Sequence, residues 1–248
     1  MKDYADKNIW IIGASSGIGR ALAVELDQRG ARLVLSARDS KKLEELSASL
    51  SAHHLVLPCD VTDPDIMSNA AKTALTFFGH IDSVLFLAGT YQPMKLNSLD
   101  IASLQNIISI NLNGAFNVIH AVIPILLAQK SGQIGICASV AGYRGLPNSQ
   151  PYSATKAALI NLTESLRAEM SPLGLDIRLI SPGFVRTPMT DKNTFPMPMM
   201  IEPENAAKAI AEGLKGDHFE IHFPLLFTWI MKILRLLPSS IYFRIIPK

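Results

Sequence analysis

The chain has 248 residues, of which 48% are hydrophobic and 18% are charged. This is enough apolar material for one substantial core, so a peptide, a staple-dependent miniprotein and a largely disordered chain are excluded. Lys and Arg number 23 against 21 Asp and Glu, and these charges are dispersed, so the formal net charge is only +2. No basic stripe is available for a phosphate backbone, and we expect no nucleic-acid partner.

Cysteine and histidine usage argues against disulfides and metals. Cys59 and Cys137 are too few for a disulfide framework and lack metal-ligand spacing. No ligand spacing with acidic partners is found at His53, His54, His80, His120, His218 or His222. We therefore predict no metal site. The apolar run 9–12 is too short for a signal peptide, and no stretch of about 20 uninterrupted apolar residues occurs, so we expect a cytoplasmic protein.

Short β-rich runs alternate with longer amphipathic runs along the chain. The predicted strands are 8–12, 31–36, 53–58, 82–89, 132–139, 175–183 and 219–224. The predicted helices are 16–30, 40–50, 64–78, 99–129 and 150–170. Such alternation predicts an α/β fold, a doubly wound parallel sheet of Rossmann type with helices on both faces, because parallel strands need helical crossovers. We expect a single domain over residues 1–224, with the Met- and Pro-rich segment 188–203 as a substrate loop.

A glycine-rich turn follows the first strand directly. The run Gly13-Ala-Ser-Ser-Gly17-Ile-Gly19 leads into a helix, which is where a doubly wound sheet places a nucleotide-binding turn. Glycines there allow a sharp turn and a close approach of backbone to pyrophosphate. The spacing GxxxGxG is weak by itself, because a plain tight turn would look the same. The predicted cofactor contacts are Gly13, Ser15, Ser16, Gly17, Ile18 and Gly19.

The second strand ends on a cation where an NAD site usually has a carboxylate. The run is Leu35-Ser36-Ala37-Arg38, about twenty residues after the turn. Arg38 offers a planar fork suited to a ribose 2′-phosphate, so the sequence favours NADP over NAD. An exposed loop arginine without a ligand is the alternative.

Tyr152 and Lys156 lie four residues apart in a predicted helix and therefore share one face. We expect the lysine charge to favour the phenolate and so to lower the tyrosine pKa, which would give an acid/base usable near neutral pH. Ser139 follows a predicted strand at its carboxyl end and could donate a hydrogen bond to a substrate carbonyl. These three residues are the predicted catalytic group.

Taken together, these motifs resemble the short-chain dehydrogenase/reductase family in its compact form. The resemblance runs from about residue 8 to 187. It includes GASSGIG, the run Cys59-Asp60-Val61, Leu87-Ala88-Gly89, Asn111, Ser139, Tyr152 with Lys156, and the stretch Pro182 to Thr187. It implies that Tyr152 transfers the proton, Ser139 holds the reacting oxygen, Lys156 binds the nicotinamide ribose, and Asn111 supports a water-borne proton relay. Asn113 is offset by two residues and is the less suitable relay position.

The resemblance also implies the remaining cofactor contacts. Asp60 and Val61 would contact adenine, and Ala88 and Gly89 the ribose. The nicotinamide carboxamide and the pyrophosphate would be contacted by Pro182, Gly183, Val185 and Thr187. One departure concerns the family's Asn-Asn-Ala-Gly run, which is Phe86-Leu87-Ala88-Gly89 here. Without the two amides, hydrogen bonds between strands must be replaced, which puts stability rather than chemistry in question.

The extension 225–248 is apolar and interrupted by cations at Lys232, Arg235 and Arg244. We interpret it as an amphipathic helix beyond the last strand. Such a helix can pack on the body or on a second subunit, or it can lie in a membrane interface with its cations at anionic headgroups. We expect a homo-oligomer, a dimer or a tetramer, with peripheral membrane contact as the alternative use of this tail.

The leading functional hypothesis is an NADP(H)-dependent oxidoreductase that interconverts an alcohol and a ketone or aldehyde by hydride transfer. The Met, Phe and Pro side chains of 188–203 favour an apolar small molecule. Nucleotide-sugar reduction or epimerisation is a rival, but the chain has little room for a larger substrate domain. A second rival is a silent dinucleotide-binding sensor or membrane-peripheral scaffold.

Overall fold

The computed structural model describes residues 3–51 and 54–246, so the prediction for His53 lies outside it. Within these residues, seven strands form one parallel sheet in the order β3-β2-β1-β4-β5-β6-β7. The strands are β1 (Asn8–Ile12), β2 (Arg32–Ser36), β3 (Leu55–Val56), β4 (Ser83–Phe86), β5 (Gln133–Cys137), β6 (Asp176–Pro182) and β7 (Glu220–Phe223). The order reverses beside β1, so the carboxyl ends of β1 and β4 open a crevice at the switch point. The predicted doubly wound sheet is confirmed.

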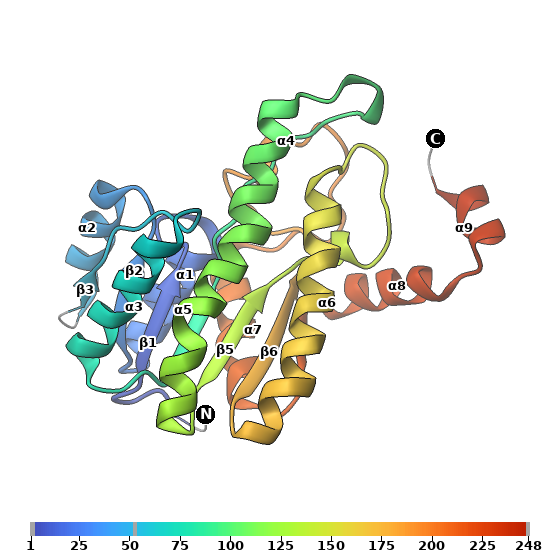
Figure 1. The fold of residues 1–248 in the computed structure, drawn as a ribbon. Coiled ribbons are helices and arrows are strands. Elements are labelled where there is room, and N and C mark those ends of the chain that lie inside the picture. Colours follow the sequence, from blue (N-terminus) through green and yellow to red (C-terminus); the bar gives the residue numbers. More distant parts are fainter. Residues whose placement is uncertain (1–2, 52–53, 247–248) are drawn as a thin grey trace.

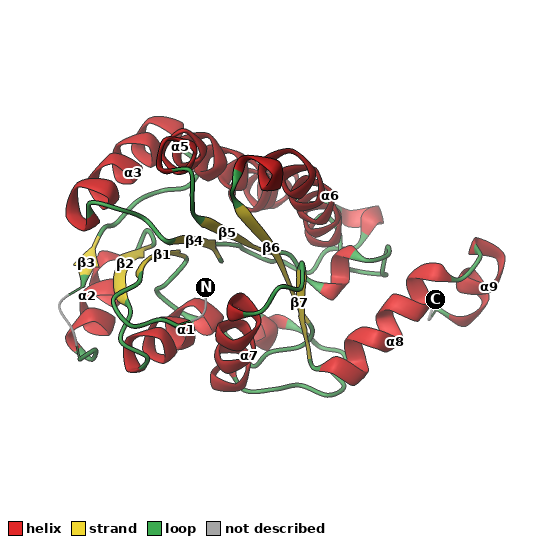
Figure 2. Ribbon diagram, turned by 90° about the horizontal axis from the view of Figure 1, so that it is seen from below, coloured by secondary structure: helices red, strands yellow, loops and turns green. Residues whose placement is uncertain are grey.

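Helices cover both faces of the sheet (Figure 2). One layer holds α1 (Gly17–Gln28), α2 (Ser40–Ala48) and α7 (Pro203–Lys215), and the other holds α3 (Pro64–Phe78), α5 (Gly114–Gln129) and α6 (Tyr152–Met170). Strand β1 is buried along its whole length because alternate side chains enter the two cores. Ile9 and Ile11 pack under the first layer, and Trp10 and Ile12 pack under the second. Two hydrophobic cores thus fix the sheet between the layers.

The predicted helix 99–129 is present but is not a regular α-helix throughout. It consists of α4 (Ile101–Ile108), a π-helical turn (Ser109–Asn113) and α5. Figure 1 shows α4 continuing into α5 along the sheet. This stretch is long and apolar enough to cross a membrane, but nearly half of its most apolar window is buried in the fold. It therefore serves as a core helix, and length and composition alone are weak grounds for a membrane span.

Phe86 and Leu87 replace the amides of the family pattern with apolar packing. Phe86 is fully buried in the core under α3 and α5, and Leu87 packs against the opposite core. The Leu87 amide still donates to the Ile12 carbonyl at 2.8 Å, which extends the pairing of β4 with β1. Main-chain bonds and buried side chains thus hold this strand without side-chain amides.

The carboxyl-terminal part holds more structure than the sequence pattern indicated. Helix α7 was not predicted, although its alanines and isoleucine recur at helical spacing and are buried against β6 and β7. The tail forms two helices rather than one, α8 (Leu225–Leu236) and α9 (Ser239–Ile245). They are separated at Pro238, whose ring cannot continue a helix. Both lie beyond the β7 edge of the sheet, away from the two helical layers (Figures 1 and 2).

Candidate active site

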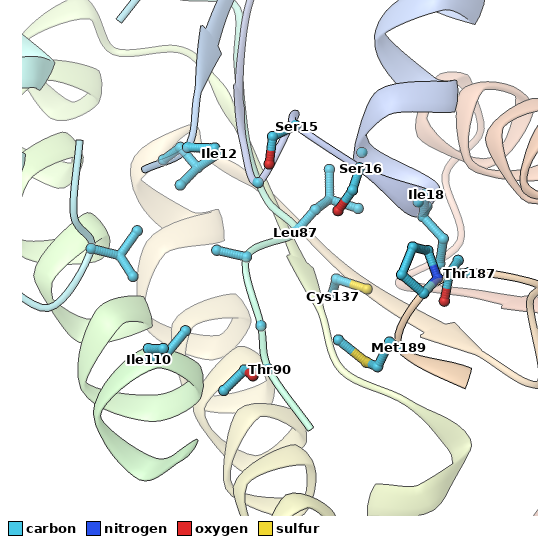
Figure 3. A pocket seen from close by; sticks show the side chains of 18 of the residues that line it. Ile12, Ser15, Ser16, Ile18, Leu87, Thr90, Ile110, Cys137, Thr187 and Met189 are labelled. Atoms are coloured by element: carbon cyan, nitrogen blue, oxygen red, sulfur yellow. The ribbon is translucent and has the colours of Figure 1, made fainter. Parts of the chain in front are cut away.

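One cavity of about 460 Å³ lies at the carboxyl ends of the central strands. Figure 3 shows Ser15 and Ser16 of the glycine-rich turn, Leu87 and Thr90 after β4, and Thr187 after β6 around it. Every predicted cofactor residue lines this cavity, as do Ser139, Tyr152 and Lys156. Asn111 is the one predicted site residue that does not line it. The fold therefore brings together motifs that are up to about 170 residues apart in the chain.

The glycine-rich turn passes so close to its neighbours that side chains would not fit. Gly13 has φ +103°, and a Cβ placed there would lie 2.6 Å from the Ala88 nitrogen. Gly19 packs against the Gly13 carbonyl, and a Cβ at Gly19 would clash with that carbonyl oxygen. Ser16 precedes α1 without a side-chain cap, so the first amides of that helix have no side-chain partner, and residues 16–19 line the cavity. This cradle and the helix dipole suit a pyrophosphate, so the residues present fit a dinucleotide.

Two cations line the cavity beyond the end of β2. Arg38 is exposed, and Lys42 follows on the first turn of α2. The carboxylate between them, Asp39, caps α2 by accepting from the Lys42 amide at 3.1 Å. It also pairs with the Lys42 ammonium at 3.2 Å. Asp39 is therefore engaged at the helix terminus, while Arg38 is an exposed cation of the cavity lining.

Asp60 and Val61 form another wall of the cavity. Asp60 accepts hydrogen bonds from the Thr62 amide at 2.9 Å and from its hydroxyl at 2.8 Å, which fixes the turn after residue 59. The Val61 carbonyl accepts from the side-chain nitrogen of Asn117 at 2.9 Å, and Gly114 allows α5 to approach the Val61 side chain. The wall is thus tied to the long helix.

Ser139 and Tyr152 meet because α6 begins beside the end of β5. Ser139 accepts from the Ala141 amide at 3.1 Å and donates to the Pro182 carbonyl at 3.4 Å, so its hydroxyl is held between β5 and β6. Tyr152 opens α6, and its ring packs edge-on against Tyr91 with centroids 5.1 Å apart. Burial raises the pKa of the Tyr152 hydroxyl, and a hydrogen bond with the Ser139 side chain opposes this rise.

Lys156 lies one turn further along α6 and is almost completely buried. Its ammonium donates to the Cys137 carbonyl at 2.8 Å and lies 5.5 Å from the centre of the Tyr152 ring. Burial lowers the pKa of Lys156. The expected lowering of the Tyr152 pKa by Lys156 is not found in the protein by itself, where burial of the phenol raises that pKa and the Lys156 ammonium is bound to the Cys137 carbonyl.

Asn111 acts as a buried clamp in the π-helical turn. Its side-chain oxygen accepts from the Thr90 amide at 2.7 Å, and its side-chain nitrogen donates to the Thr90 carbonyl at 3.0 Å. The same nitrogen donates to the Thr155 hydroxyl at 3.1 Å, and Thr155 lies on α6 between Tyr152 and Lys156. π-Helical turns often occur at functional sites. Here the turn joins the loop after β4 to the helix that carries the acid/base pair.

The remaining wall follows β6. Pro182, Gly183, Val185 and Thr187 line the cavity, and so do the next three residues, Pro188 to Thr190. The Thr190 hydroxyl accepts from the Thr187 amide at 2.9 Å and donates to the Val185 carbonyl at 2.8 Å, which closes the turn. The predicted substrate loop 188–203 thus begins at the cavity, although it includes a short turn at Thr190–Lys192 and the first residue of α7.

Several lining residues were not among the predicted site residues. They are Ile12, Ala37, Asp39, Lys42, Cys59, Leu87, Thr90, Ile110, Cys137 and Ala138, whereas Pro188, Met189 and Thr190 belong to the predicted substrate loop. Most of them directly neighbour predicted residues, so proximity in sequence is the signal that could have found them. Thr90 is different, because its role depends on a pairing with Asn111 that no spacing reveals. Cys59 and Cys137 are both buried thiols, and burial raises the pKa of each.

Comparison with known proteins identifies the family of this chain. The family model described as short chain dehydrogenase matches residues 7–196. An uncharacterized oxidoreductase of Staphylococcus epidermidis is 36% identical over 214 residues, which cover 86% of this chain and 93% of the relative. The chain therefore belongs to the short-chain dehydrogenase/reductase family. It is an NAD(P)-dependent oxidoreductase of that family.

Solved structures show the same fold. A short chain dehydrogenase from Burkholderia cenocepacia in complex with NADP has a TM-score of 0.86 and covers 99% of this chain and 100% of its own at 23% identity. A short chain dehydrogenase/reductase from Burkholderia phymatum in complex with NAD has a TM-score of 0.87 and covers 100% and 98%, also at 23% identity. At this identity the likeness concerns the fold, and the two neighbours differ in the dinucleotide they hold.

Proposed function

We propose that this protein interconverts an alcohol and a ketone or aldehyde with NADP(H), acting on an apolar small molecule. The observation that carries the proposal is that one and the same cavity is lined by Arg38 after β2 and by Ser139, Tyr152 and Lys156 beyond β5. Arg38 offers a cationic fork for a 2′-phosphate, and Tyr152 offers a proton donor beside a second hydroxyl. NAD is the less suitable dinucleotide, because the nearest carboxylate, Asp39, is committed to Lys42.

The proposed chemistry divides the work between cofactor and chain. When bound, the nicotinamide dinucleotide supplies or accepts the hydride. In the reduction direction, the Ser139 hydroxyl would hold the carbonyl oxygen, and the Tyr152 hydroxyl would donate the proton to it. Lys156 would hold the nicotinamide ribose, since its ammonium lies at the cavity wall between Cys137 and Tyr152. In the oxidation direction Tyr152 would accept the proton.

Asn111 keeps a proposed role in the proton relay, but through position rather than direct contact. Its side-chain donors and acceptor are used by Thr90 and Thr155, so the side chain has little capacity left for a water. The clamp orients α6 relative to the loop after β4. We therefore assign Asn111 as a positioning residue. The proton relay would use main-chain groups of the π-helical turn that contains it.

The substrate wall supports an apolar substrate. Met189 lines the cavity, and Phe195 of the same loop packs edge-on against Phe184 with centroids 6.0 Å apart. Met and Phe side chains adapt to apolar ligands and offer few hydrogen bonds to sugars. The catalytic unit would comprise residues 1–224, and 225–248 would serve a separate contact.

A substrate screen tests the proposal. Purified protein is mixed with NADPH and a panel of apolar and polar carbonyls, and NADPH consumption is followed by absorbance, with NADH in parallel. We expect turnover of apolar carbonyls with NADPH and slower turnover with NADH. Dinucleotide binding without turnover of any carbonyl or alcohol would favour the silent sensor or scaffold.

Assembly and location are also part of the proposal. We expect a cytoplasmic homo-oligomer, a dimer or a tetramer. Exposed apolar side chains at Ile101 on α4 and Phe116 on α5 support a contact along that helical layer, because such side chains mark interaction surfaces. Light scattering of the purified protein measures the assembly. A monomeric mass would refute the expectation.

A further inference from the structure

Helix α8 exposes large apolar side chains to solvent, whereas a surface helix ordinarily exposes polar ones. Phe227, Thr228 and Met231 are buried against the body. The outward side carries large apolar side chains at helical spacing, namely Leu225, Leu226, Trp229, Ile230, Ile233 and Leu236, and each of these is at least 42% exposed. Ile241, Phe243 and Ile245 of α9 add exposed apolar surface. A patch of this kind on a folded protein marks a contact site.

This tail surface, the exposed side chains of α8 and α9, is held in place by the body. Arg144 donates to the Leu234 carbonyl at 3.0 Å and to the Leu237 carbonyl at 2.5 Å, which ties down the end of α8. The Arg144 guanidinium lies over the Tyr242 ring at 3.9 Å, and the Tyr242 hydroxyl donates to the Gly145 carbonyl at 2.5 Å. The apolar surface is therefore presented in a fixed orientation.

The charge of the tail distinguishes between the two possible partners of this surface, a second copy of the chain and an anionic membrane. From residue 225 to the end, the chain contains Lys and Arg but no Asp or Glu. Lys232 is paired with Glu220 of the body at 2.8 Å, so it is not free for lipid as the sequence suggested. Arg235 and Arg244 are exposed. In a two-fold dimer formed through this surface, two tails that both lack carboxylates would face each other, whereas an anionic surface complements Arg235 and Arg244.

Length and composition favour a membrane interface over a span. Helix α8 has 12 residues and is therefore about 18 Å long, which is too short for a hydrocarbon core of about 30 Å. A helix lying in the interface buries only its apolar side, and Trp is favoured at that depth. Trp229 lies within the apolar side of α8.

The tail is in packing contact with the substrate loop. Phe227 of α8 packs against Phe184 with ring centroids 5.4 Å apart, and Phe184 packs against Phe195 of the loop. Phe195 and Met199 of that loop are themselves exposed. Gly183, which lines the cavity, lies directly under the Phe227 ring. Helix α8 is thus joined by packing to the loop that borders the cavity.

We propose that α8 and α9 dock this protein on an anionic lipid bilayer, which places the loop 188–203 at the lipid surface. An apolar alcohol or carbonyl could then reach the cavity from the membrane. This second part rests on the proposed function, whereas the docking does not.

Vesicle binding tests the docking. Full-length protein is sedimented with vesicles of phosphatidylcholine alone or mixed with phosphatidylglycerol. We expect at least tenfold tighter binding to the mixed vesicles and a decline as salt rises. The double variant Trp229→Glu/Ile233→Glu should bind at least tenfold more weakly. The matched control Ile66→Glu/Leu173→Glu changes apolar side chains that are 42% and 53% exposed elsewhere, against 56% and 60% in the tail, and should bind like wild type.

Tryptophan fluorescence tests the orientation. The chain has two tryptophans, and Trp10 is fully buried, so brominated phosphatidylglycerol should quench Trp229 selectively. In a Trp229→Phe protein, the added variant Phe195→Trp should also be quenched by the brominated lipid. Absence of quenching in the vesicle-bound Trp229→Phe/Phe195→Trp protein would overturn the placement of the loop.

Specific results would overturn the docking proposal. Absence of wild-type binding, or equal binding by the wild type and the tail variant, would overturn it. If the wild type stays off vesicles and its mass by light scattering exceeds that of the tail variant, the surface binds a second copy instead. None of these measurements needs turnover. A protein that docks but converts no substrate would therefore disprove the proposed function and leave the docking intact.

Discussion

Tyr152 is half-buried at the start of α6 with its hydroxyl next to Ser139, and this geometry gives the first prediction. The variant Tyr152→Phe keeps the ring that packs on Tyr91 and removes only the proposed proton donor. We expect kcat to fall by about 10²–10⁴-fold, with dinucleotide affinity nearly unchanged. Stopped-flow turnover and dinucleotide titration measure both quantities. Tyr91→Phe is the matched control and should retain most activity, and near wild-type turnover in Tyr152→Phe would refute the assignment.

The raised pKa of Tyr152 predicts opposite pH dependences for the two directions. Burial favours the neutral phenol, so the proton donor is present at neutral pH and is lost only as pH rises through the raised pKa. Carbonyl reduction should therefore stay nearly constant from neutral to mildly alkaline pH. Alcohol oxidation needs the phenolate and should rise by about tenfold per pH unit while little phenolate is present. Initial rates against pH measure both, and a flat oxidation profile would contradict the role.

Arg38 provides a test of cofactor choice. The variant Arg38→Asp would repel a 2′-phosphate and could accept from a 2′-hydroxyl, so the ratio of kcat/KM for NADPH over NADH should fall by about 10–100-fold. Lys42→Ala is the control, because its ammonium is shared with Asp39 and should matter less. Cofactor titrations decide the matter. Tighter binding of NAD than of NADP by the wild type would make Arg38 an ordinary surface residue.

At the scale of the element, the turn between β1 and α1 depends on close backbone contact. In Gly13→Ala the new Cβ would lie 2.6 Å from the Ala88 nitrogen, at a φ of +103° that L-residues avoid. We expect a loss of about 2 kcal/mol in the free energy of unfolding, measured by urea denaturation, together with weaker dinucleotide binding.

Gly145→Ala is the matched control for this prediction. A Cβ at Gly145 meets nothing within 4 Å, and its backbone is outside the left-handed region. Its stability should change by less than about 0.5 kcal/mol. Equal losses in the free energy of unfolding for Gly13→Ala and Gly145→Ala would show that the close contact at Gly13 does not determine stability.

At the scale of the whole molecule, the tail contributes both exposed apolar side chains and side chains buried in the core. Removal of 225–248 takes Phe227 and Met231 out of the core that also holds α6. Each such side chain contributes about 1.5–3 kcal/mol when buried, so we expect the melting temperature to fall by about 10 °C. Calorimetry measures the shift. Removal of 239–248 keeps α8 and should cost clearly less, and an unchanged melting temperature without α8 would refute its place in the core.

Local pattern was sufficient for the sheet and most of the site. The alternation of apolar runs predicted all seven strands, because a buried parallel strand must be apolar along its length and its crossover must be helical. The glycine-rich turn, Arg38, Ser139, Tyr152 and Lys156 were predicted because their spacing carries the chemistry, and all of them line one cavity. Helix α7 could have been predicted from its periodic alanines, and its omission was an error of interpretation.

The sequence by itself thus determined the order of elements and the kinds of side chain at the carboxyl ends of the strands. Only the tertiary structure decided how those side chains are used. Asn111 became a clamp on Thr90, and Lys232 became the partner of Glu220, through contacts between segments 21 and 12 residues apart. The Tyr152 pKa rises instead of falling because desolvation depends on everything packed around the phenol. Periodicity and spacing report which residues share a face, whereas burial and pairing depend on the whole fold.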